Sequence, residues 1–147
     1  MNLGRRDALG PAVGAIAMVL SWGAVAADEP AEDIVVKTKA DIASTNLTPR
    51  DLGSRYGQAL GAVELCTGAK ITEKASALPA VYSGAELDAF NVQQKKIYDA
   101  WLRVKHCVRE DDPNQCKVII DESCAAVLTE IGPKGTAFPG LIEFSKP

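Results

Sequence analysis

Apolar side chains recur every three or four residues along three separate segments of the chain, a spacing that predicts three amphipathic helices. The first helix is predicted to begin at Pro49 and to end near Gly68. The second is predicted to follow a capping box over residues 83–86, and the third to run from Pro113 to Gly132. The pattern therefore predicts an all-α fold, a small bundle of three or four helices.

The apolar faces of these helices are expected to meet in one core. Its predicted members are Leu60, Val63, Leu87, Phe90, Ile97, Trp101, Ile120, Val127 and Leu128. Residues 28–47 are mostly polar or small, with one apolar island at residues 34–36, and are predicted to form a flexible leader, either unstructured or with a short helix or strand, before a helical domain over residues 48–147. Residues 68–82 are predicted to form a connection with at most one helical turn, near 72–77. The tail after residue 133 is rich in Gly and Pro, so we expect it to be irregular.

Residues 1–27 have the layout of a cleavable secretory signal. Arg5 and Arg6 form a positive segment, a short apolar stretch follows, and small residues precede Asp28. The apolar stretch is shorter than the roughly 20 residues that a spanning helix needs. We therefore expect a periplasmic or secreted protein that is cleaved near Ala27 and does not insert stably into a membrane. An uncleaved anchor is the alternative, and the pattern leaves open whether the Sec or the twin-arginine route is used.

The four cysteines are predicted to form two structural disulfides, as is usual in exported proteins. Cys116 and Cys124 lie on one predicted helix, about 12 Å apart along its axis, whereas a disulfide tolerates Cα separations of roughly 4.4–6.8 Å. Cys107 and Cys116 flank the short turn between the second and third helices, where an antiparallel hairpin would bring them together. Among the three possible connectivities we therefore favour Cys107–Cys116 with Cys66–Cys124.

Gly53, Gly57 and Gly61 form a stripe with a spacing of four along the first predicted helix. Each glycine inside a helix costs about 1 kcal/mol relative to alanine, so three in register imply close approach by another element. That element is either a neighbouring helix of the same chain or a partner, which would be another protein or a second copy of the chain.

Two other features point to possible binding sites. Gln94 occupies a position in the apolar seam of the second helix, where it either sets the packing register or faces a small ligand cavity near Trp101. The tail contains Phe138, Leu141 and Phe144, which either fold back over the bundle or form an exposed docking peptide.

Composition and charge argue against several classes of function. Loss of residues 1–27, which hold Arg5, Arg6 and Asp7, changes the formal net charge from −3 to −4, so the basic footprint of a nucleic-acid-binding protein is missing. The cysteines lack the close spacing of zinc or redox sites, and His106 is expected to lie in solvent among basic residues. We expect no metal, no cofactor and no enzymatic activity, because no nucleophile–base pair or phosphate-binding loop is evident.

The function predicted from the sequence is that of an exported, non-enzymatic binding or scaffold protein. In this interpretation the glycine stripe and the apolar tail contact a protein partner. The alternative is a small-ligand carrier with a cavity near Gln94 and Trp101.

Overall fold

The computed structural model describes residues 31–110 and 112–145, and for residues 108–110 the backbone only. The predicted signal over residues 1–27 lies outside these ranges. The described chain is largely helical, with a minor two-stranded sheet. In chain order the elements are α1 (Glu32–Ala43), α2 (Pro49–Leu65), β1 (Ala69–Ile71), α3 (Glu73–Val81), α4 (Gly84–Glu110), α5 (Pro113–Ile131) and β2 (Ile142–Phe144). The predicted all-α class is confirmed.

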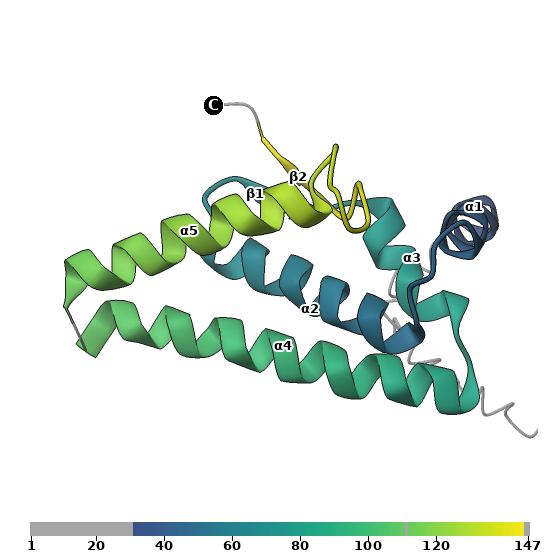
Figure 1. Cartoon of the computed structure of the whole chain (residues 1–147), viewed down its shortest axis with the longest axis horizontal. Coiled ribbons are helices and arrows are strands. Elements are labelled where there is room, and N and C mark those ends of the chain that lie inside the picture. Colours follow the sequence, from purple (N-terminus) through teal and green to yellow (C-terminus); the bar gives the residue numbers. More distant parts are fainter. Residues whose placement is uncertain (1–30, 111, 146–147) are drawn as a thin grey trace, which may run out of the picture.

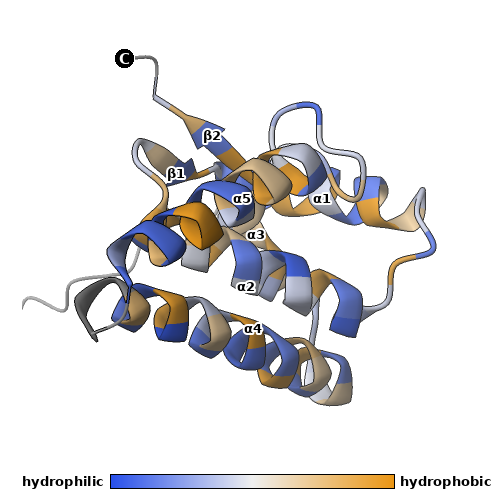
Figure 2. Cartoon of the chain, turned by 60° about the vertical axis from the view of Figure 1, so that its left-hand side comes forward, coloured by the Kyte–Doolittle hydropathy of each residue, from blue (hydrophilic) through white to orange (hydrophobic). Residues whose placement is uncertain are grey.

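The three predicted helices correspond to α2, α4 and α5, which form the body of the molecule (Figure 1). The glycines of α2 meet successive turns of α4 in chain order, so these two helices run in the same direction. An ion pair joins Arg55 of α2 to Glu130 of α5, and a disulfide joins Cys66 to Cys124 farther along, so α5 runs the opposite way. Apolar and polar residues alternate around α4 and α5, as Figure 2 shows.

Local signals explain where two of these helices begin. The Thr48 hydroxyl accepts a hydrogen bond from the Asp51 amide, and the Asp51 carboxylate accepts one from the Thr48 amide at 2.9 Å, a reciprocal capping box. The Thr48 hydroxyl also donates a hydrogen bond of 2.6 Å to the Asp51 carboxylate, and this bond, followed by the one from the Thr48 amide, holds the pKa of Asp51 below its ordinary value. Asp112 caps α5 by accepting from the Asn114 amide. The capping box predicted over residues 83–86 is not among the hydrogen bonds of the described residues, and Gly84 has a left-handed backbone with φ of 54°.

Two segments are more ordered than the sequence predicted. The leader contains the whole helix α1, which packs on α3, and an ion pair of 2.7 Å joins Asp41 of α1 to Lys74 of α3. Thr38 of α1 is fully buried. The connection after α2 contains β1 and the nine-residue helix α3. Its apolar residues are mainly alanines, and Pro79 lies inside the helix, so its pattern was too weak to predict its full length.

The core lies where α2, α3, α5 and the tail meet, which differs from the predicted core. Phe90 and Val127 are buried as predicted, but Val63 and Leu128 are 43% and 44% exposed. Leu60, Leu87, Ile97, Trp101 and Ile120 are half-buried. Their place in the core is taken by Leu52, Leu78, Ile131, Phe138, Leu141 and Ile142. The reason is that the tail folds back and supplies apolar side chains that a bundle of three helices alone would lack.

Both predicted disulfides are present. Cys66 and Cys124 join the end of α2 to the middle of α5, with their Cα atoms 5.7 Å apart. Cys107 and Cys116 close the turn between α4 and α5, with a Cα separation of 5.9 Å. Both separations lie within the range that a disulfide allows.

Candidate functional site

The predicted partner-binding glycines are not at the surface. Gly53, Gly57 and Gly61 are buried against α4. A Cβ atom added at Gly53 would lie 2.3 Å from the Phe90 carbonyl oxygen, and one added at Gly61 would lie 2.2 Å from Cγ of Trp101. The stripe therefore allows α2 and α4 to pack closely within one chain, and the prediction that it forms a partner-binding groove is wrong.

The predicted docking peptide is also internal. Phe138 is 1% exposed, Leu141 is fully buried, and Phe144 is half-buried in β2, where it pairs with Ala69 of β1. The Thr72 hydroxyl donates a hydrogen bond of 2.6 Å to the carbonyl of Gly140, which fixes the tail to the start of α3. The tail folds back over the bundle, so its aromatic residues are not available to a partner in this structure.

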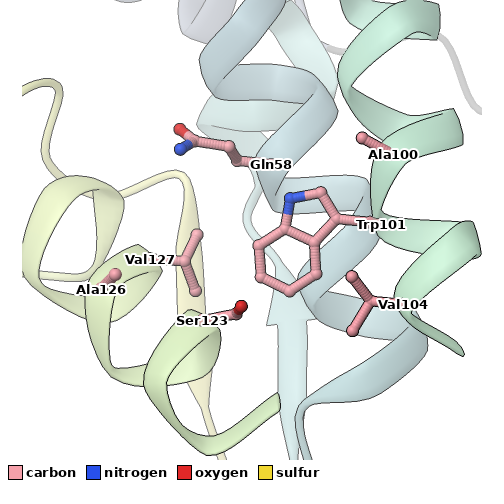
Figure 3. Close-up of a pocket in the computed structure, with 7 residues that line it drawn as sticks. All are labelled: Gln58, Ala100, Trp101, Val104, Ser123, Ala126 and Val127. Carbon is pink, nitrogen blue, oxygen red and sulfur yellow. The ribbon is translucent and has the colours of Figure 1, made fainter. Parts of the chain in front are cut away.

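An open cleft lies between α4 and α5, with α2 at its base. It has a volume of about 250 Å³. From α4 it is lined by Ala100, Trp101 and Val104. From α5 it is lined by Ser123, Ala126 and Val127, and from α2 by Gln58. Figure 3 shows the Trp101 indole in the centre of the cleft, facing the short side chains of α5.

Residue size explains why the cleft exists. Ala100, Ser123 and Ala126 have short side chains, so they leave space beside the large Trp101 ring where larger residues would fill it. Trp101 itself lies across Gly61, whose missing Cβ leaves room for the base of the indole side chain. The third glycine of the stripe thus positions the main wall of the cleft.

A polar cluster closes the end of the cleft near Gln58. The Gln58 amide donates to the Glu130 carboxylate at 3.0 Å, and the Arg55 guanidinium donates to the Gln58 carbonyl oxygen at 3.1 Å and to Glu130. These side chains are partly buried, so their orientation is held by mutual hydrogen bonds. The Trp101 indole nitrogen points toward the Gln58 side of the cleft (Figure 3), and its N–H donates to no acceptor among the described residues.

The two residues that the sequence analysis assigned to a ligand site lie in different places. Trp101 lines the cleft, but Gln94 does not. The Gln94 carbonyl faces Gly57, where an added Cβ would lie 2.5 Å from its oxygen, so this residue belongs to the contact between α2 and α4. The sequence analysis missed the α5 side of the cleft. The small residues Ser123 and Ala126, three apart on one helix, were the signal that could have indicated it.

Other candidate chemistry is weak in the described residues. His106 is exposed, as expected, and Lys105 next to it forms an ion pair of 2.6 Å with Glu64. Across residues 31–110 and 112–145 no group of three or more His, Cys, Asp or Glu side chains is placed to hold a metal ion. In the same ranges no helix combines the length and apolar character needed to cross a membrane.

Comparison of the chain with protein-family models, curated proteins and solved structures found no match. The assignment of a site therefore depends on the geometry of the Trp101 cleft alone.

Proposed function

We propose that this protein is an exported, non-enzymatic binding protein that carries a small ligand in the cleft between α4 and α5. The observation that carries the proposal is the position of Trp101, a half-buried aromatic ring whose face and N–H are both open to a mainly apolar cleft. Ligand sites in proteins typically combine apolar and aromatic walls with a few oriented polar groups. Here Gln58, Ser123 and the indole N–H supply those groups.

The size of the cleft limits the ligand. Pockets for drug-sized molecules have volumes of roughly 300–1,000 Å³. A cleft of about 250 Å³ is below that range, so it suits a molecule with one ring or a short aliphatic chain. This favours the small-ligand alternative of the sequence analysis over a protein partner, whose predicted contact residues are buried.

The two disulfides support the proposal because they fix the walls of the cleft. Cys124 follows Ser123 directly and links α5 to α2, while Cys107 lies one turn beyond Val104 and links α4 to the start of α5. Walls that are held in place before binding lose less conformational entropy when a ligand enters. The cross-links thus favour a preformed site over one that must open.

A carrier role fits the lining better than catalysis. None of the seven described residues that line the cleft is titratable, and Ser123 has no base beside it in that set. Export is supported by the pattern of residues 1–27 and by the two disulfides, which are typical of oxidising compartments. The intact mass of the protein from the exported fraction tests the proposed export. We expect a mass that lacks about 27 residues and four thiol hydrogens. A full-length chain with reduced cysteines would contradict export.

The experiment that tests the site follows the Trp101 indole N–H by NMR in the oxidised protein purified from the exported fraction. Trp101 is the only tryptophan once residues 1–27 are removed, and the Trp101→Phe variant assigns its signal. Titration with the neutral probe 3-phenylpropanamide should shift the Trp101 signal in a saturable way, with a Kd of about 1 mM or lower, as expected for a ligand of this size.

Two neighbouring alanines on α5 provide a matched pair of variants. Ala125 and Ala126 are both exposed, but only Ala126 lines the cleft. Ala126→Phe should fill the cleft and weaken binding at least tenfold, on the order of 1.4 kcal/mol, whereas Ala125→Phe should leave the Kd unchanged. Equal effects of the two variants, or a Trp101 signal that does not move with the probe, would reject the cleft as the site.

A further inference from the structure

Lys96 and Arg103 of α4 are not among the residues that line the cleft, but helical spacing places them at its α4 edge. Lys96 is four residues before Ala100, and Arg103 is three residues after it, so helical geometry places both on the side of α4 that Ala100 presents to the cleft. Both side chains are exposed. The Cα atoms of Lys96 and Arg103 are about 10.5 Å apart along the helix, so both long side chains can reach a group above Ala100.

These two cations differ from the other lysines of α4. Lys95 forms an ion pair of 2.6 Å with Asp99, and Lys105 forms one of 2.6 Å with Glu64. Among the described residues, no carboxylate lies within ion-pair distance of Lys96 or Arg103. Within the described part of the chain their charges are not neutralised by an ion pair, and they can attract an anion to the α4 edge of the cleft.

Three acidic residues must be weighed against this attraction. Asp99 lies three residues after Lys96 and four before Arg103, but Lys95 binds its carboxylate at 2.6 Å. Glu130 lies at the Gln58 end of the cleft, but Arg55 and Gln58 bind its carboxylate. Glu122 is exposed on α5, four residues before Ala126, and it would favour a cation at the opposite edge. The Lys96 and Arg103 pair exceeds this single acid, so the net charge at the mouth favours an anion.

We infer that the ligand is a small carboxylic acid with one aromatic ring or a short aliphatic chain. Its apolar part lies against Trp101 and Val104, and its carboxylate lies between Lys96 and Arg103. This inference depends on the proposed function, because it assigns the ligand class of the same cleft. Exposed ion pairs are individually weak and are screened by salt, so the carboxylate supplies selectivity more than affinity.

A series of three probes tests the inference by calorimetry on the oxidised protein from the exported fraction at low salt. 3-Phenylpropanoate, 3-phenylpropanamide and 3-phenylpropylamine share one ring and chain and differ in charge. The carboxylate should bind about fivefold to tenfold more tightly than the amide, and the amine more weakly than the amide, as two exposed ion pairs would predict.

Two double variants with equal changes in charge identify the cause of the preference for the carboxylate probe. The double variant Lys96→Gln and Arg103→Gln should remove the preference for the carboxylate and leave the Kd of the amide within about twofold. The double variant Lys105→Gln and Lys134→Gln removes the same charge away from this edge, leaves the Lys95–Asp99 ion pair intact and should keep the preference.

The outcomes separate this inference from the proposed function. Equal binding of carboxylate and amide, with a shifted Trp101 signal, would overturn the ligand class and leave the cleft as a binding site. Tightest binding of the amine would also overturn it, because Glu122 would then dominate. If both double variants lose the preference for the carboxylate equally, the net charge of the protein causes the preference, and the inferred contact with Lys96 and Arg103 is wrong. Failure of all three probes to shift Trp101 would reject the proposed function itself.

Discussion

Gly61 lies directly under Trp101, so replacing it by alanine tests both the packing of α2 on α4 and the geometry of the cleft. The added Cβ would lie 2.2 Å from Cγ and 2.5 Å from Cβ of Trp101. Carbon atoms in good contact are about 3.5–4.0 Å apart. Because the crowded atoms are at the base of the Trp101 side chain, the clash is relieved only by a change of rotamer or by a shift of α4.

The expected loss of stability is the difference between two opposing effects. Overpacking of this kind costs typically about 1–3 kcal/mol, and replacing a helical glycine by alanine gains about 1 kcal/mol. The difference is a loss of stability of about 0–2 kcal/mol. Because the clash is severe and involves the base of a large side chain, Gly61→Ala should lie in the upper half of this range, about 1–2 kcal/mol, which lowers the urea midpoint by roughly 0.5–1 M at an m value of about 2 kcal/mol/M. Urea unfolding followed by circular dichroism measures this shift.

Gly53→Ala is the matched comparison. Its added Cβ would lie 2.3 Å from the Phe90 carbonyl oxygen, so a comparable loss of stability is expected. Phe90 does not line the cleft, so the Trp101 indole N–H signal should move in Gly61→Ala and stay in place in Gly53→Ala. A gain of about 1 kcal/mol in both variants, as helix propensity alone predicts, would refute the close approach of α2 and α4.

Two further predictions concern stability. Removing the Cys66–Cys124 bridge should cost about 4 kcal/mol and removing Cys107–Cys116 about 2.6 kcal/mol by the loop-entropy relation, because the bridges span 58 and 9 residues. Urea unfolding of the two variants in which both cysteines of one bridge are replaced by alanine measures these losses. A larger loss without Cys107–Cys116 than without Cys66–Cys124 would contradict the prediction. Burial of the Tyr82 hydroxyl raises its pKa to about 12, so the folded state holds this proton more tightly than the unfolded chain, and stability should fall as the pH rises from about 10 to about 12. Tyr82→Phe should reduce this loss of stability at high pH. If the stability of the variant depends on pH as that of the unchanged protein does, Tyr82 is not the source of the loss.

The disulfide pairing was predictable from the sequence because it depends on local helix geometry. The distance between Cys116 and Cys124 on one helix excludes a bond between them, and a short hairpin brings Cys107 near Cys116. The helix starts at Pro49 and Pro113 were predictable for the same reason, since their signals lie within a few adjacent residues.

The core was less predictable because it depends on contacts between distant segments. The buried Phe138 and Leu141 come from the tail, and no periodic pattern there indicates where they pack. The glycine stripe correctly implied a close approach, but the sequence could not say whether the neighbour was α4 or a partner. Val63 and Leu128 were assigned to the core by helical spacing, yet the structure leaves them substantially exposed, since no other element covers them fully.

The cleft was also predictable only in the part that depends on local sequence. Trp101 was identified from its own helix, whereas its opposite wall depends on how α5 crosses α2, which is set by the tail and by the Cys66–Cys124 bridge. Gln94 was misassigned because its polar side chain was considered, while its backbone carbonyl is the part that contacts Gly57.

The most direct test of the central claim is to locate a bound probe by intermolecular NOEs. With 3-phenylpropanamide and the oxidised protein from the exported fraction, the account predicts NOEs from the ring protons to the methyl groups of Val104, Ala126 and Val127 and to the Trp101 indole. NOEs to the exposed methyl groups of Val118 or Leu128 instead would place the ligand on the outer surface of α5 and contradict the account.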